Sequence, residues 1–291
     1  MTPAQGTPST PPAETAAGPA PGPAEEATLS LGHGDLHVCL DGPRHAPALL
    51  LVHGSAATAR SWDWLVPLLT SSHRVVRVDL PGHGRSPAPA DGDFATAAQA
   101  RAVGAALERL GIGHAVVVGH SSGGYTATAL AGQRPGLVTA LALINTGPAL
   151  EAFIAPESGP PDPADWPPSD EELRRFASSG FRDGFEIPQE FVEQLRTLDL
   201  RASAAAMRGS LAYLKEQALP ARLAPLGTPL QVIFGDQDRR WLPSSAADYR
   251  AVPGADVTML PGSGHTPIIE DPAGTAAPLL AFTARHRGPR T

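Results

Sequence analysis

The sequence predicts an α/β fold in which a mainly parallel sheet carries helices on both faces. From residue 28 onward, short apolar runs alternate with segments of helical spacing. The runs at 48–52, 75–79 and 115–119 are almost continuously apolar, which is typical of strands covered on both sides. Repeated strand–helix–strand order then favours parallel strands, because each connecting helix crosses one face of the sheet.

The predicted elements follow one another along the chain. Val103, Leu107 and Leu110 give the segment 95–110 helical spacing, and a helix of small residues runs from Ser121 to about residue 133 and ends before Pro135. A last helix is expected at 275–285. Strands are expected at 28–31, 36–40, 48–52, 75–79, 115–119, 137–145, 229–235 and 256–260.

Residues 1–27 form a segment of different composition. They include seven prolines and no aromatic residue, so they cannot bury enough apolar surface to offset the entropy of ordering. We therefore expect a disordered tail. The segment has no Lys or Arg near Met1 and no apolar stretch typical of a secretory signal, which favours a cytoplasmic protein.

Residues 148–226 interrupt the alternation of strands and helices. A proline-rich stretch at 156–168 is followed by helical segments at 169–178, 188–195 and 201–218, the first with Ser169 and Glu172 at capping-box spacing. We interpret this block as a helical cap inserted into a core formed by 28–147 and 227–291. Insertions at the carboxyl ends of strands commonly cover a ligand site.

Composition excludes several classes of function. The net charge is −7 and only 18% of residues are charged, so a basic nucleic-acid surface is not expected. No stretch of about 18 apolar residues predicts a membrane span. Cys39 is the single cysteine, and neither a phosphate-binding loop nor metal-ligand spacing is present, so we expect no metal and no cofactor. The expected partner is a small-molecule substrate; the oligomeric state is not determined by the sequence.

The strongest chemical signal is Gly119-His120-Ser121-Ser122-Gly123, directly after a buried strand and before a helix. This is the G-x-S-x-G pattern in the strand–turn–helix context that it requires. The sharp turn strains the backbone of Ser121, exposes its hydroxyl, and needs small residues on either side so that strand and helix can approach. We therefore predict that Ser121 is a nucleophile.

A serine hydroxyl needs a general base, and the base needs an orienting carboxylate. His265 lies on a glycine-rich loop five residues after the last predicted strand, and imidazole exchanges protons near neutral pH. Asp236 and Asp238 both follow the strand that ends at Gly235. We favour Asp238, because the longer turn lets its side chain reach the next loop, and keep Asp236 as the alternative.

Acyl transfer also requires hydrogen-bond donors for the oxyanion. The backbone N–H of Ser122, which follows the nucleophile, is the first candidate. The second should come from the turn after the 48–52 strand, where we predict Ser55, with Ala56 as the alternative. His53 is interpreted as a structural residue of this turn.

Together these motifs resemble the α/β-hydrolase superfamily. The matching segments are LLLVHG (49–54), VDLPGHGRS (78–86), GHSSGG (119–124), VIFGDQD (232–238) and GSGHTPIIEDP (262–272). The resemblance implies an eight-stranded sheet, a helical cap between the sixth and seventh strands, and a triad of Ser121, Asp238 and His265. Haloalkane dehalogenases and epoxide hydrolases of this superfamily carry aspartate at the elbow, so serine argues against those chemistries.

The sequence therefore predicts a cofactor-free serine hydrolase that cleaves an ester, lactone or thioester of a small-to-medium apolar acid through a Ser121 acyl-enzyme. One alternative is a carbon–carbon bond hydrolase that uses the same triad. Another is a lyase or a ligand binder that does not hydrolyse, since fold alone does not fix function. The candidates for substrate contact are Phe153, Trp166, Trp241 and Ile268.

Overall fold

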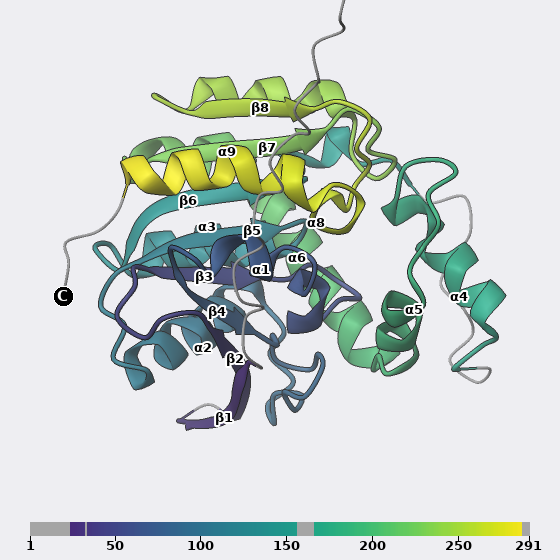
Figure 1. The fold of residues 1–291 in the computed structure, drawn as a ribbon, viewed down its shortest axis with the longest axis horizontal. Coiled ribbons are helices and arrows are strands. Elements are labelled where there is room, and N and C mark those ends of the chain that lie inside the picture. The colour runs from purple at the N-terminus through teal and green to yellow at the C-terminus, as the bar shows by residue number, and fades with distance from the viewer. Residues whose placement is uncertain (1–23, 33, 156–165, 287–291) are drawn as a thin grey trace, which may run out of the picture.

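The computed structural model describes residues 24–32, 34–155 and 166–286. Eight strands form one sheet in the order β1-β2-β4-β3-β5-β6-β7-β8. β1 and β2 pair antiparallel with each other, β2 pairs antiparallel with β4, and the other neighbouring strands are parallel. The predicted α/β class is confirmed (Figure 1). The strands are β1 (Glu25–Leu31), β2 (Gly34–Asp41), β3 (Ala48–Val52), β4 (Arg74–Val78), β5 (Ala115–His120), β6 (Val138–Ile144), β7 (Leu230–Gly235) and β8 (Asp256–Leu260).

The amino-terminal boundary differs from the expectation. The predicted tail, 1–27, includes the start of β1 at Glu25, and residues 1–23 lie outside the described part. Glu25 pairs with Leu40 in the antiparallel ladder with β2. This pairing orders a segment that is too polar to be held by burial alone, because the backbone groups find partners in the neighbouring strand.

Helices cover both faces of the sheet and enclose two separate cores. Along β3, Leu49 and Leu51 point into one core, whereas Leu50 and Val52 point into the other, as the two-residue period of a strand requires. Helices α1 and α9 contribute to the core that contains Leu49 and Leu51, and α2, α3 and α7 contribute to the core that contains Leu50 and Val52. These helices are α1 (Val66–Leu69), α2 (Thr96–Arg109), α3 (Gly123–Gln133), α7 (Leu219–Leu223) and α9 (Pro272–Arg285).

The chain between β6 and β7 contains no strand among its described residues. It contains α4 (Asp170–Ala177), α5 (Gln189–Arg196), α6 (Leu200–Glu216) and α7, and part of the proline-rich stretch, 156–165, lies outside the described residues. The capping box predicted at Ser169 is present, with Glu172 as its reciprocal partner. Figure 1 shows α4 and α5 to the right of the sheet. No helix of the described residues has the length and apolar character needed to cross a membrane.

Candidate active site

Ser121 lies in the sharp turn between β5 and α3. Its φ of 52° falls in the left-handed region that non-glycine residues rarely occupy. A Cβ atom on Gly119 would lie 2.5 Å from the backbone of α3, and one on Gly123 would lie 2.4 Å from the carbonyl oxygens of Val52 and His53. The glycines therefore allow β5, α3 and the end of β3 to meet beneath the serine.

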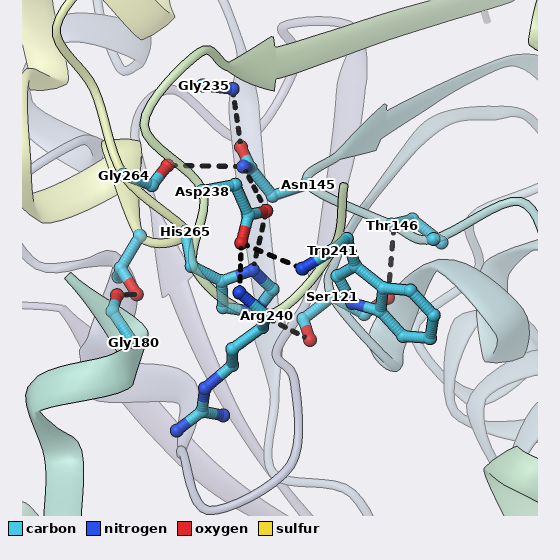
Figure 2. Close-up of polar contacts among 12 residues, drawn as sticks. Ser121, Asn145, Thr146, Gly180, Gly235, Asp238, Arg240, Trp241, Gly264 and His265 are labelled. Carbon is cyan, nitrogen blue, oxygen red and sulfur yellow. Dashed lines mark hydrogen bonds and ion pairs between the residues drawn. The ribbon is translucent and has the colours of Figure 1, made fainter. Parts of the chain in front are cut away.

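The loop after β8 brings His265 against Ser121. The imidazole Nε2 lies 3.0 Å from Ser121 Oγ, and Nδ1 lies 2.9 Å from Asp238 Oδ2 (Figure 2). The side chains of His265 and Asp238 are almost completely buried. When Nδ1–H donates to the carboxylate, the lone pair of Nε2 faces the serine hydroxyl, which is the arrangement a general base requires.

Asp238 is fixed by hydrogen bonds from several directions. Its Oδ1 accepts the backbone N–H groups of Arg240 (2.7 Å) and Trp241 (3.1 Å), and its Oδ2 accepts the Asn145 amide (2.7 Å). Burial acts to raise the pKa of Asp238, but His265 and these hydrogen bonds outweigh it and hold the pKa below its usual value. The carboxylate is therefore ionised at neutral pH.

Asp236, the alternative acid, lies elsewhere. It is exposed, and its Oδ1 accepts the backbone N–H of Gly262 at 2.7 Å. This contact holds the loop that follows β8, whereas it is Asp238 that the structure brings to His265.

The turn after β3 places Ser55 beside the nucleophile turn. The backbone N–H of Ser55 donates to Ser122 Oγ at 2.7 Å, and the two hydroxyl oxygens lie 2.8 Å apart. The next residue, Ala56, has a φ of 54°. The backbone N–H groups of Ser55 and Ser122 thus belong to adjoining turns. The N–H of Ser55 is occupied by the hydroxyl group of Ser122, which leaves it when the Ser122 side chain rotates about χ1.

Two buried histidines brace these turns. His53 Nδ1 is 2.7 Å from the Gly54 carbonyl oxygen, and its Nε2 accepts the backbone N–H of Leu80 at 3.0 Å. His120 Nε2 is 2.8 Å from the carbonyl oxygen of His265. Burial lowers the pKa of His53 to about 4 and that of His120 to about 3, with a further lowering by the neighbouring His83 and His265, so both are neutral. They are fixed hydrogen-bonding groups of the scaffold.

A cavity opens onto Ser121 and His265 and holds about 490 Å³ of empty space, its open mouth included. Its walls come from the turn after β3, from the nucleophile turn and from the helical insertion. Apolar side chains dominate the part contributed by the insertion: Phe176, Ala177, Phe181, Phe191 and Leu195.

The four residues predicted to contact substrate do not lie among those that line this cavity. Ile268 is fully buried in the core, and Trp241 is buried with its ring 5.1 Å from that of Phe153. Trp166 packs edge-on against Phe176, at 6.5 Å between ring centroids. The correction has a simple cause: neighbouring positions in sequence do not reveal which face of a loop or helix turns inward.

Three possible metal ligands lie on β1 and β2, at one edge of the sheet: Glu26, His37 and Cys39. Their ligating atoms lie within 4.8 Å of one another. Glu26 forms an ion pair with Arg85. Burial raises the pKa of Cys39 to about 11, which opposes the thiolate that metal binding requires. The chemistry of these donors does not favour a metal centre.

Comparison with known proteins identifies the family of the chain. Residues 49–277 match the model of the alpha/beta hydrolase family. The chain belongs to the alpha/beta hydrolase family. It is 31% identical to the pimeloyl-[acyl-carrier protein] methyl ester esterase of Edwardsiella ictaluri (strain 93-146), over 84% of this chain and 95% of that protein.

Solved structures have the same fold as this alpha/beta hydrolase. A hydrolase from Pseudomonas aeruginosa PA01 aligns with a TM-score of 0.73 at 26% identity, over 88% of this chain and 97% of the other. The enol-lactonase from Burkholderia xenovorans LB400 aligns with a TM-score of 0.71 over 89% of this chain and 100% of the other, and its 22% identity supports the fold alone.

Two residues of this alpha/beta hydrolase were missed by sequence reasoning. Asn145, at the end of β6, donates to Asp238 and to the Gly264 carbonyl oxygen (3.1 Å), and its own φ is 45°. Glu270, with a fully buried side chain, accepts the backbone N–H groups of Gly264 (3.0 Å) and Thr266 (3.0 Å) on either side of His265. The sequence signal for Asn145 was its position directly after β6, the neighbour of the strand β7 that precedes Asp238.

Proposed function

We propose that this hydrolase cleaves an ester, lactone or thioester of a small-to-medium, largely apolar acid through an acyl-enzyme on Ser121. The observation that carries the proposal is the chain of contacts from Ser121 Oγ through the two nitrogens of His265 to Asp238, at 3.0 and 2.9 Å. Nucleophile and base are both side chains, so the reaction needs no cofactor.

The mechanism follows from the atoms in place. Ser121 Oγ attacks the carbonyl carbon while His265 Nε2 takes its proton, and ionised Asp238 stabilises the imidazolium that forms. The carbonyl oxygen becomes an oxyanion and accepts the backbone N–H groups of Ser122 and Ser55, which requires Ser122 Oγ to give up its contact with Ser55. His265 then protonates the leaving group, and water attacks the acyl-enzyme by the same steps.

We assign residues 148–226 the role of a cap over this site. The support is that its α4, α5 and the turn between them supply the apolar part of the cavity wall. A small cavity of this kind selects for size and apolar character of the bound acid. Among relatives, several curated proteins at 28–31% identity are named as esterases that act on the methyl ester of pimeloyl-[acyl-carrier protein], which supports a carboxylic ester as substrate.

The test is labelling with a fluorophosphonate probe, followed by mass spectrometry of the adduct. We expect rapid labelling of Ser121 in the native protein, and loss of labelling in Ser121→Ala and His265→Ala. Turnover of p-nitrophenyl acetate measures the same site with a smaller reagent, so it separates exclusion by the cap from an inactive serine. Absence of both labelling and turnover in the folded protein would contradict the proposal and favour a binder or a lyase.

If simple esters are not hydrolysed although Ser121 is labelled, a diketone substrate becomes the decisive probe. Release of a carboxylic acid from it would assign the carbon–carbon bond hydrolase reaction to the same triad.

A further inference from the structure

One arginine lines the cavity that contains Ser121 and His265. Arg240 follows β7, two residues after Asp238, and its backbone is clamped on both sides. Its N–H donates to Asp238 Oδ1 at 2.7 Å, and its carbonyl oxygen accepts the N–H of Ile154 at 2.9 Å. The residue therefore has a fixed origin at the active site, and its side chain extends beside His265 (Figure 2).

The guanidinium group of Arg240 forms no hydrogen bond and no ion pair with any residue that the structure describes, and no dashed line reaches it in Figure 2. It lies beside the backbone of Gly180 in the insertion, where a Cβ atom would come within 3.5 Å of its Nη2. Burial lowers the pKa of Arg240, and the charge of Asp238 raises it. Arginine nevertheless remains charged at physiological pH.

The neighbouring Arg239 behaves differently. Its side chain is exposed and lies 3.8 Å from the carboxylate of Asp183, which is itself fully exposed. The two arginines have the same charge and adjacent positions, but Arg240 is the one that faces the cavity. The sequence alone indicates only that adjacent side chains point apart.

A half-buried cation without a counter-charge is costly, because its desolvation is not repaid by a partner. The other residues that line the cavity within the described chain are apolar, hydroxyl-bearing, glycine or histidine, and none is a carboxylate. No lining residue within the described chain therefore offers a carboxylate to the guanidinium group, and an anionic group on a bound ligand would supply one.

We propose that Arg240 is the subsite for a carboxylate carried by the substrate, so that the preferred substrates are esters or thioesters with a second, anionic end. The planar guanidinium group binds a carboxylate through two parallel hydrogen bonds. A single arginine matches the single charge of a carboxylate better than the two charges of a phosphate monoester. This inference rests on the proposed hydrolysis at Ser121.

The test compares three pairs of substrates, and the members of each pair differ in one charge. The monomethyl esters of succinic, adipic and suberic acid carry a free carboxylate, and the corresponding dimethyl esters do not. Initial rates are followed by methanol release for the native protein and for Arg240→Met, which keeps an unbranched stem without the charge. Arg239→Met is the matched control, and Arg240→Lys restores the charge without the planar fork. Circular dichroism confirms that each variant is folded.

We expect the native protein to prefer the monomethyl esters. Arg240→Met should raise KM for them by about 10- to 100-fold, the range expected for the loss of hydrogen bonds to a charged group. Its kcat, and its kcat/KM for the dimethyl esters, should stay within about threefold. Arg240→Lys should recover part of the loss. Arg239→Met should leave both substrate classes within about twofold, since an exposed charge is screened.

Equal losses for charged and neutral esters in Arg240→Met would overturn the inference and leave Arg240 as a packing residue against Gly180. So would a native enzyme without preference for the charged ester. If the native protein hydrolyses neither class and Ser121 is not labelled, it is the proposed function that fails. The subsite is then judged by thermal shift with suberate: stabilisation of the native protein and Arg239→Met, absent in Arg240→Met, supports it, and equal shifts in all three overturn it.

Discussion

Asp236 and Asp238 are two positions apart and have different surroundings. Asp238 is buried, receives four hydrogen bonds and faces His265, whereas Asp236 is exposed and holds the Gly262 turn. In an amide at position 238 the oxygen stays with the two backbone N–H groups that Oδ1 accepts, so the NH₂ group faces His265 and cannot accept its Nδ1–H. An amide at 236 keeps its oxygen for the Gly262 N–H.

We therefore expect Asp238→Asn to lower kcat by about 10³- to 10⁴-fold, by analogy with loss of the orienting acid in a serine protease triad. The matched variant Asp236→Asn should stay within about threefold. Steady-state kinetics on one ester measures both. A larger loss of kcat in Asp236→Asn than in Asp238→Asn would show that Asp238 is not the acid of the triad.

The turn that joins β5 to α3 requires both elements to pack closely against the end of β3. Gly123, the first residue of α3, lies against the end of β3, where a Cβ atom would come within 2.4 Å of two carbonyl oxygens. Gly132, near the end of the same helix, would have its nearest contact at 3.8 Å, with the side chain of Leu226. Replacement of glycine by alanine is thus expected to change the free energy of unfolding in opposite directions at the two ends of this helix.

Gly123→Ala must displace backbone, so we expect it to lower the free energy of unfolding by about 3 kcal/mol or more, within the range of severe core overpacking. Gly132→Ala should raise it by about 0.5–1 kcal/mol, because alanine loses less conformational entropy in a helix. Urea unfolding followed by circular dichroism measures both. Similar effects from the two variants would show that space is not what selects glycine at 123.

The whole molecule should lose stability in mild acid. Burial holds the pKa of His53 at about 4 and that of His120 at about 3, whereas in the unfolded chain both return to about 6.5. Between about pH 6.5 and 4 the unfolded state binds more protons, so the free energy of unfolding falls as the pH falls. Asp238, whose pKa is lowered in the fold, adds to the loss at still lower pH.

Urea unfolding at several pH values between 7.5 and 5 should show a fall that approaches about 1.4 kcal/mol per pH unit for each of the two histidines. His120→Gln should reduce the slope of the free energy of unfolding against pH by the contribution of one histidine, about 1.4 kcal/mol per pH unit. A free energy of unfolding that is constant over this range would contradict the neutral, buried state of His53 and His120.

Most of the core architecture could be predicted from the sequence, because buried strands and their periodicity are local signals. β3 and β8 begin and end at the predicted residues. The start of β1 was not predicted, because Glu25 is ordered by backbone pairing with Leu40 of β2 and not by an apolar pattern of its own.

Spatial contacts were the harder part of the site. Asn145 acts through the Asp238 carboxylate, which lies 93 residues away in sequence. Glu270 contacts the backbone of Gly264 and Thr266, and its role depends on the path of the loop around His265. The four residues expected to contact substrate are not among those that line the cavity around Ser121, because which side of a loop faces inward depends on packing that single positions do not encode. Motifs that require a fixed local geometry, such as the turn at Ser121, were the reliable part.

The carboxylate of Glu270 also receives the backbone N–H of Arg182, which belongs to the insertion, at 2.9 Å. Thr266 adds a second tether through its hydroxyl group, which donates to the carbonyl oxygen of Gly180 at 2.5 Å. Two hydrogen bonds thus connect the loop around His265 to residues 180–182 of the insertion. The position of the imidazole therefore depends on how residues 180–182 of the insertion pack, as well as on the sequence of the loop that carries it.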